Sequence, residues 1–438
     1  MDKEPVRESR GSVFRRILRL ASSFALATIL VASCSSDLPP DTQAGHTLEG
    51  LLDAFNTGSI DKLAAYQRRY QPDKALFGLA QIQADSGGFE KLHILKSEPF
   101  YIEFVVNERA GKLTRLGMLD VSKTAPHSIT SLILREGGVQ KGMVAVKLDN
   151  ATRARVINAA IEKLKEHYVF SDLAVKMEGA VRQHWQQGDY DSLTDPERFV
   201  NIVSAHLREI SHDKHLAIIL AETEPPKGTV AEPASNCGFQ SVKRLESNVG
   251  YLKLDKLGDP ALCSETAIAA MERVAGVRAI IFDLRDNGGG HAGMVNLLGA
   301  YLFSEPQELS GLWEPKEAYT RHSWTLPYVP GSRFAQVPAY VLTSPRTFSA
   351  AEQFAYDLKN LKRAVIVGQR TGGGAHPTGP FQIDQDFTIL IPWGRVINPI
   401  TQTDWEQVGV QPDVEAPSAA ALTKALELVG SATSPPRH

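Results

Sequence analysis

A series of short apolar runs in the second half of the chain places the strongest constraint on its fold. The runs are VGYLKL (249–254), RAIIFDL (278–284), AYVLTS (339–344), RAVIVG (363–368) and FTILIP (387–392). Helical patterns separate several of them, as in SETAIAAMERVAG (264–276) and SAAEQFAYDLKNL (349–361). Strands that alternate with helices form a sheet covered by helices. We therefore predict an α/β domain over residues 236–425.

Two further units are expected before this domain. Residues 150–222 contain ARVINAAIEKLKEHYVF and PERFVNIVSAHLREI, whose apolar residues recur at spacings of three and four, so a helical subdomain is predicted. Between residues 46 and 140, helical patterns precede extended runs such as FYIEFVVN (100–107), which predicts a small α+β domain. This domain is similar in pattern to cystatin and nuclear-transport-factor-like modules. It holds no clustered Ser, His, Cys and acid set, and we assign it no chemistry.

The N-terminus has the features of an export signal. Arginines such as Arg15 and Arg16 precede an apolar run over 20–32, which is short for a membrane span and ends in V-A-S-C. This ending resembles a bacterial lipobox, so we expect a signal peptide over 1–34, lipidation of Cys34 and a polar tether over 35–45. An ordinary signal or a weak anchor is the alternative. The expected location is the bacterial cell envelope, with the protein lipid-anchored to a membrane and facing the periplasm.

The charge, the cysteines and the histidines of the chain indicate which binding partners and cross-links to expect. The formal net charge is −3 and no basic stripe lies outside the N-terminus, so no nucleic-acid partner is expected. Cys237 and Cys263 remain if Cys34 is lipidated, and an exported chain could pair them, although the sequence leaves this open. SHDKH (211–215) offers two histidines but no third ligand nearby and no H-E-x-x-H pattern, so no metal or cofactor is predicted.

The stretch TFSAAEQF (347–354) allows two interpretations of Ser349. Ser349 and Glu352 form the S-x-x-E pattern of a capping box at a helix start. A serine between a strand and a helix could instead be a nucleophile if a base lay within reach. Three glycines after a predicted strand, in RDNGGG (285–290), would let backbone amides approach a ligand. Each of these motifs is weak alone.

Their combination is more informative. AIIFDLRDNGGG, TFSAAE, GGGAHP and WEQVGVQPD follow one another between residues 279 and 413. Together they resemble the serine peptidases of the tail-specific (C-terminal processing) and tricorn superfamily, and most closely its interphotoreceptor retinoid-binding protein-like branch. The resemblance covers about residues 150–425. It implies a crotonase-like (ClpP-like) α/β protease core with a helical N-terminal subdomain and no PDZ domain, here in a bacterial lipoprotein form.

The resemblance also assigns roles to residues. It implies Ser349 as nucleophile, His215 as the base and Glu406 as the third member, with His212 and, less favoured, His376 as competing bases. The position of the lysine in the tail-specific branch falls on Gly374, so a Ser–Lys dyad is not implied. An oxyanion hole is expected from the amides of three residues: Gly288, Gly289 and Ala350.

We therefore expect a serine-type peptidase that cleaves peptide or protein substrates through an acyl-enzyme. Histidine suits the role of base because its ordinary pKa lets it accept and return a proton near neutrality. Two rivals remain: a binding protein for a peptide or apolar ligand on the same fold, and a non-peptidase acyl hydrolase using the same triad.

Overall fold

The structure is a computed structural model that describes residues 37–74, 77–110, 113–136, 146–221, 236–317 and 319–431. The predicted signal peptide and Cys34 lie outside these residues. Helix α1 begins at Gln43, inside the segment expected to be a tether. Within the described ranges, no helix combines the length and the apolar composition that crossing a membrane requires.

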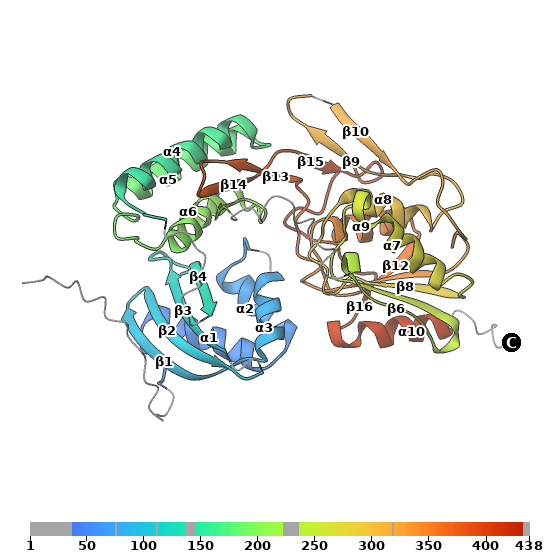
Figure 1. The fold of residues 1–438 in the computed structure, drawn as a ribbon, viewed down its shortest axis with the longest axis horizontal. Coiled ribbons are helices and arrows are strands. Elements are labelled where there is room, and N and C mark those ends of the chain that lie inside the picture. The colour runs from blue at the N-terminus through green and yellow to red at the C-terminus, as the bar shows by residue number, and fades with distance from the viewer. Residues whose placement is uncertain are drawn as a thin grey trace, which may run out of the picture. The chain divides into compact units, whose positions relative to one another are not determined.

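The N-terminal segment, residues 37–136, is an α+β unit (Figure 1). Its helices are α1 (Gln43–Asn56), α2 (Ile60–Tyr70) and α3 (Phe77–Ser86), and its strands are β1 (Phe89–Glu98), β2 (Tyr101–Glu108), β3 (Thr114–Val121) and β4 (Ile129–Glu136). The strands form an antiparallel sheet in chain order. Burial alternates along β2, so one face of the sheet packs with the helices around Phe55 and Phe104.

Three helices follow: α4 (Asn150–His167), α5 (Ser171–Gln186) and α6 (Pro196–Ser211). Asp195 caps α6, and Pro196 occupies its first turn, where a missing amide does no harm. The helix ends at His212 in the left-handed conformation, with φ 53°. The chain then turns through Asp213 and His215 into the short strand β5 (Ala217–Leu220), so the end of α6 positions this turn.

The predicted α/β core is confirmed. Its six-stranded sheet has the order β16-β12-β11-β8-β7-β6, and all neighbours are parallel except β6. The strands are β6 (Phe239–Leu245), β7 (Val249–Leu254), β8 (Ala279–Asp283), β11 (Ala339–Thr343), β12 (Ala364–Gly368) and β16 (Val414–Glu415). Because β8, β11 and β12 are parallel neighbours, the loops that follow them emerge at one edge of the sheet. These loops carry RDNGGG, TFSAAE and GGGAHP.

Helices cover both faces of the sheet (Figure 1). One face packs against α7 (Pro260–Arg273), α8 (Ala292–Ala300) and α9 (Ala350–Asn360), and the other packs against α10 (Ala421–Ser431). Phe282 is fully buried on the first face and stacks edge-on against Phe354 of α9. This contact fixes the helix that begins beside Ser349.

Two smaller sheets complete the described chain. One has the order β10-β9-β15, formed by β9 (Glu308–Glu314), β10 (Tyr319–Trp324) and β15 (Arg395–Ile397). The other has the order β13-β14-β5, formed by β13 (Thr378–Gln382) and β14 (Phe387–Pro392) with β5. The pairing of β14 with β5 joins the C-terminal half to the strand that follows His215.

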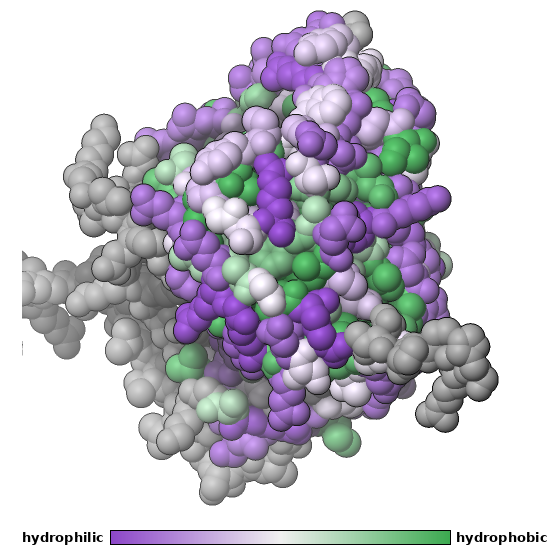
Figure 2. Space-filling view, turned by 90° about the vertical axis from the view of Figure 1, so that its right-hand side faces the viewer, coloured by the Kyte–Doolittle hydropathy of each residue, from purple (hydrophilic) through white to green (hydrophobic). Residues whose placement is uncertain are grey.

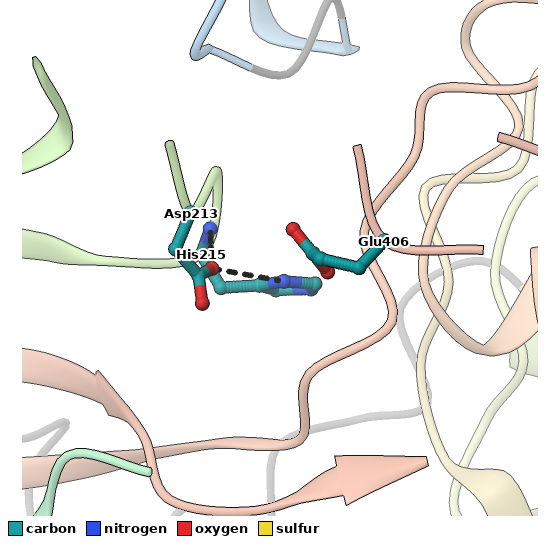
Figure 3. A group of neighbouring side chains, drawn as sticks. All are labelled: Asp213, His215 and Glu406. Carbon is teal, nitrogen blue, oxygen red and sulfur yellow. Dashed lines mark hydrogen bonds and ion pairs between the residues drawn. The ribbon is translucent and has the colours of Figure 1, made fainter. Parts of the chain in front are cut away.

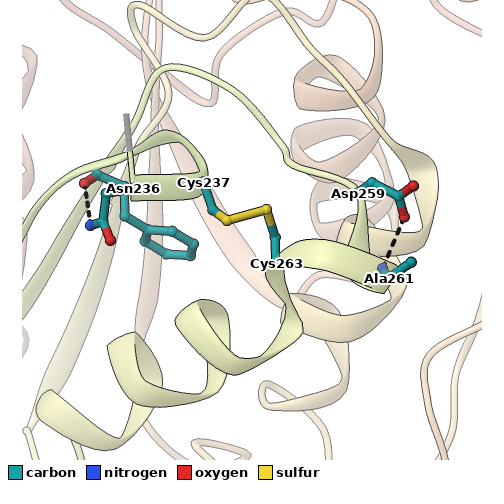
Figure 4. The surroundings of a disulfide bond; sticks show 6 residues. Asn236, Cys237, Asp259, Ala261 and Cys263 are labelled. Atoms are coloured by element: carbon teal, nitrogen blue, oxygen red, sulfur yellow. Dashed lines mark hydrogen bonds between the residues drawn. A yellow bond between two sulfur atoms is a disulfide. The ribbon is translucent and has the colours of Figure 1, made fainter. Parts of the chain in front are cut away.

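Cys237 and Cys263 form a disulfide, which settles the pairing that the sequence left open (Figure 4). Their Cα atoms are 5.6 Å apart, and the bond ties the turn before β6 to the first part of α7. Asp259 caps the same helix by accepting a hydrogen bond from the Ala261 amide at 2.9 Å. The start of α7 is therefore held by two independent links.

The outer surface is mixed in character. Figure 2 shows one face on which hydrophilic residues dominate and hydrophobic residues lie among them. Large hydrophobic side chains such as those of Leu262 and Tyr328 are exposed in the described chain. Scattered exposure of this kind is ordinary for folded proteins and assigns no binding face.

Candidate active site

Ser349 lies at the N-terminal end of α9 in a strained conformation. Its φ and ψ are 54° and −123°, a backbone conformation that residues other than glycine rarely adopt. The backbone of Gly289 lies directly beside it, since a Cβ on Gly289 would be 2.8 Å from the Ser349 Cβ. Ser349 occupies the N-cap position of α9 and forms a capping box with Glu352. The turn that carries Ser349 therefore lies against the RDNGGG loop at the edge of the sheet.

Glu352 supplies the other half of the capping box and does more than cap. Its fully buried carboxylate accepts hydrogen bonds from the Ser349 amide at 2.8 Å and from the amides of Gly373 and Gly374 at 2.7 and 2.9 Å. Thr371 Oγ1 donates a fourth at 2.5 Å. Burial raises the pKa of Glu352 to about 7, while these four donors favour the carboxylate. Glu352 thus ties the Ser349 turn to the GGGAHP loop.

The RDNGGG loop is also fastened to the serine turn. The fully buried Asn287 accepts a hydrogen bond from the Phe348 amide through its backbone carbonyl at 3.0 Å. Its side-chain oxygen accepts from the Gly289 amide at 2.9 Å, and the Gly288 amide donates to the Asp255 carbonyl at 3.2 Å. Two of the three predicted oxyanion donors therefore already have acceptors. The amide of Ala350 has no acceptor among the described residues.

His215 approaches this region from the turn after α6. Its ring lies 4.7 Å from the ring of Phe348, the neighbour of Ser349. A Cβ on Gly374 would be 2.7 Å from His215 Cε1 and closer still to the Phe348 ring. A lysine at position 374 would therefore collide with both rings, which gives a physical reason for the absence of a Ser–Lys dyad. Burial lowers the pKa of His215 to about 4, so the imidazole is neutral at neutral pH.

Glu406 reaches the same place from the loop before β16. Its Oε2 accepts hydrogen bonds from the amides of Ala375 and His376 at 2.6 and 3.3 Å. Its Oε1 is buried and has no hydrogen-bond partner among the described residues, and the same holds for Nδ1 of His215. Burial and the nearby charge of Asp213 raise the pKa of Glu406. The carboxylate is thus held through one oxygen, and the other has no partner among the described residues.

Asp213 is a member of the site that the sequence analysis missed. The side chain is 1% exposed, and its Oδ1 accepts from the His215 amide at 3.0 Å and lies 3.9 Å from His215 Nδ1. Its Oδ2 accepts a hydrogen bond from His376 Nδ1 at 2.6 Å. Burial alone would lower the pKa of His376, but the hydrogen bond to Asp213 and the Glu406 carboxylate raise it. The D-x-H pattern that pointed to His215 also contained this acid.

Figure 3 shows Glu406 facing Asp213 and His215, which come from one turn, whereas Glu406 comes from a distant loop. One donor atom from each lies within 4.8 Å of the others. One imidazole nitrogen and two carboxylate oxygens could coordinate a divalent cation. The same set can orient a histidine base. The third ligand missing near SHDKH in the sequence is therefore supplied by a distant loop.

Of the two competing bases, His376 lies in the site beside Asp213, whereas His212 lies elsewhere. His212 is exposed, and its Nδ1 donates to Asp73 Oδ1 at 3.2 Å. The hydroxyl of Ser349 forms no hydrogen bond with any histidine in the described ranges. The structure brings the loops of the predicted triad together but leaves the serine and the base without a direct hydrogen bond.

Two family models match the part of the chain that builds this site. Residues 248–416 match "Peptidase family S41", and residues 144–245 match "N-terminal domain of Peptidase_S41 in eukaryotic IRBP". The chain contains a peptidase family S41 domain. Ser349 and Glu406 lie in the range of the S41 model, whereas Asp213 and His215 lie in that of its N-terminal domain.

Among the curated relatives of this chain are carboxyl-terminal-processing peptidases 2 and 3, both chloroplastic, of Arabidopsis thaliana. The first is 29% identical over 180 residues, which cover 39% of this chain and 32% of the relative. The second is 26% identical over 184 residues, which cover 42% and 34%. The chain thus spans about a third of the length of these relatives. A solved structure of a proposed peptidase from Parabacteroides merdae aligns with 64% of this chain and 99% of its own, at 18% identity and a TM-score of 0.49.

Proposed function

We propose that this chain is a serine-type peptidase in which Ser349 attacks the scissile carbonyl, His215 is the base and Glu406 orients the base. The observation that carries the proposal is the meeting of His215, Glu406 and Asp213 beside the loop next to Ser349, within a peptidase family S41 domain. A serine hydroxyl needs such a base to act as a nucleophile near neutral pH.

The reaction would proceed in two steps. His215 accepts the Ser349 proton through Nε2 while Ser349 Oγ bonds to the peptide carbonyl carbon. The imidazolium then returns the proton to the leaving amine, which leaves an acyl-enzyme that water hydrolyses by the same route. The amide of Ala350 would donate to the developing oxyanion, and one such donor is worth about 10²–10³ in rate. Peptide or protein chains are the substrate class.

The two orphan atoms support a closing of the triad on binding substrate. His215 Nδ1 and Glu406 Oε1 are both buried without partners. A buried polar atom that lacks a hydrogen bond is unfavourable by about 1–3 kcal/mol. A hydrogen bond between these two atoms would satisfy both and fix the imidazole with Nε2 toward Ser349. Catalytic hydrogen bonds are often long before the substrate binds.

We further propose that the protein is exported and lipid-anchored at Cys34 in a bacterial cell envelope. The V-A-S-C ending of the apolar N-terminal run supports this. Metabolic labelling with a palmitate analogue should mark the wild type and not Cys34→Ala. Equal labelling of the two would contradict the proposal.

A fluorophosphonate probe and a set of quenched fluorescent peptides test the catalytic proposal. The wild type should form one covalent adduct and cleave at least one peptide, whereas Ser349→Ala should do neither with an unchanged thermal midpoint. Peptides that bind without adduct or cleavage would instead support a binding protein on this fold. Cleavage of simple esters with no cleavage of peptides would identify a different acyl hydrolase.

A further inference from the structure

A pocket of about 650 Å³ lies beside the active-site loops, and nothing in the mechanism above uses it. One wall comes from α2 and the turn after it, including Arg68 and Lys74. The opposite wall includes Lys214, Arg370 and Val408. A hydrogen bond from Gln369 Nε2 to Asp61 Oδ1 at 2.7 Å joins the two walls. The N-terminal segment therefore forms part of a site that the α/β core does not complete alone.

The pocket carries excess positive charge. Four cationic side chains line it, namely those of Arg68, Lys74, Lys214 and Arg370, against one acid, Glu415. Neither the side chain of Arg68 nor that of Lys74 forms an ion pair or a hydrogen bond with any residue that the structure describes. Burial lowers the pKa of Lys74 to about 8 and also lowers the pKa of Lys214. Cations in a partly desolvated concave site favour an anionic ligand.

The wall that contains Lys214 and Arg370 is continuous in sequence with the proposed catalytic residues. Lys214 directly precedes His215, and its Nζ donates to the Gly372 carbonyl at 2.5 Å. The next two amides of that loop hold Glu352. Val408 lies two residues after Glu406. A ligand in the pocket would therefore touch the same chain segments that position the base and the serine turn.

The size and lining of the pocket favour a peptide over an inorganic ion. A volume of this size is typical of sites for organic ligands. Apolar residues such as Ala64, Pro345 and Val408 also line the pocket and offer contacts for aliphatic carbon. We propose that this pocket binds an acidic segment of the peptide substrate, whose carboxylates pair with Arg68, Lys74, Lys214 and Arg370. The assignment of the ligand as substrate rests on the peptidase function proposed above.

Binding to Ser349→Ala tests this proposal without turnover. The probe is a fluorescein-labelled peptide with three adjacent glutamates, compared by fluorescence anisotropy with the same peptide carrying glutamines. The glutamate peptide should bind at least 10-fold more tightly. Adding Arg68→Ala and Lys74→Ala should remove most of that preference while leaving the glutamine peptide unchanged. Arg69→Ala is the matched control because Arg69 neighbours Arg68 but packs on Tyr70 and does not line the pocket.

Three results would overturn the proposal: equal affinity for the two peptides, an equal loss with Arg69→Ala, or displacement of the glutamate peptide by inorganic phosphate at a similar concentration. The last result would indicate a small-anion site. If the glutamate preference holds but the wild type cleaves no peptide, the acidic-peptide site stands and the peptidase function fails. If the wild type cleaves peptides without the preference, only the pocket assignment fails.

Discussion

The carboxylate of Glu352 accepts a hydrogen bond from the backbone amide of Ser349, with 2.8 Å between nitrogen and oxygen. The same carboxylate holds the amides of Gly373 and Gly374, and Gly374 packs against His215. One buried acid therefore links the turn that carries the serine to the loop that contacts the histidine. The S-x-x-E pattern at the start of α9 serves the active site through its glutamate.

Replacement of Glu352 by glutamine should destabilise the protein and slow labelling of Ser349. One carboxylate oxygen would become an NH2 group that faces two donors, either those of Thr371 and Gly373 or those of Ser349 and Gly374. Lost hydrogen bonds to a buried charged group are worth about 1.5–3 kcal/mol each. Urea unfolding should show a loss of about 3 kcal/mol. Glu427→Gln, on the exposed face of α10, is the control and should change neither property. Wild-type stability of Glu352→Gln would contradict this role.

Replacement of Ser349 by glycine should stabilise the fold while abolishing activity. A non-glycine residue at φ 54° and ψ −123° stores strain of about 1–3 kcal/mol, which glycine relieves. Part of the gain is offset by the larger entropy of glycine in the unfolded chain, so we expect about 1 kcal/mol in chemical denaturation. Ser349→Ala keeps the strain and should match the wild type. A less stable Ser349→Gly would show that the turn is unstrained.

Asp213 is expected to act as a positioning residue for His215. Asp213→Asn should slow fluorophosphonate labelling by about 10²-fold or more, because the acid that faces the imidazole loses its charge. The charge of Asp213 raises the pKa values of His215 and Glu406. Its removal should therefore move the acidic limb of the pH–rate profile to lower pH. His212→Ala, at an exposed position nearby, should leave rate and profile unchanged; an unshifted profile in Asp213→Asn would indicate a purely structural role.

Acid should destabilise the helical part of the protein through His206. Burial lowers the pKa of His206 to about 3, and a 2.8 Å hydrogen bond joins its Nδ1 to the Tyr190 hydroxyl. As pH falls below about 6.5, the unfolded chain binds a proton that the folded chain does not, so stability falls. This group should remove about 1 kcal/mol between pH 6.5 and pH 5.5. His206→Gln should flatten the pH dependence of unfolding there; an unchanged slope would contradict the assignment.

The regular elements were predictable because their patterns are local. Apolar runs such as AIIFDL and the three-and-four spacing of PERFVNIVSAHLREI reflect burial within single strands and helices. Strands β9, β10 and β13 were not predicted, since they are partly exposed and their pairing depends on distant partners. The two-residue strand β16 has no sequence pattern of its own and is defined by its pairing with β12.

The site was partly predictable for the same reason. Ser349, His215 and Glu406 stand in recognisable local motifs. Asp213 was missed because its role appears only when β5 pairs with β14 and brings the turn after α6 to His376. The commitment of the Gly288 and Gly289 amides to Asp255 and Asn287 likewise depends on loop contacts that no pattern encodes.

The proposed roles of Ser349, His215 and Glu406 are tested most directly by measuring where a covalent adduct forms and how fast it forms. Intact-mass and peptide mapping after treatment with a fluorophosphonate should find a single adduct on Ser349 in the wild type and in His212→Ala. The adduct should form at least about 10²-fold more slowly in His215→Ala and in Glu406→Gln. Labelling of His215→Ala at the wild-type rate, or an adduct on another residue, would contradict the account.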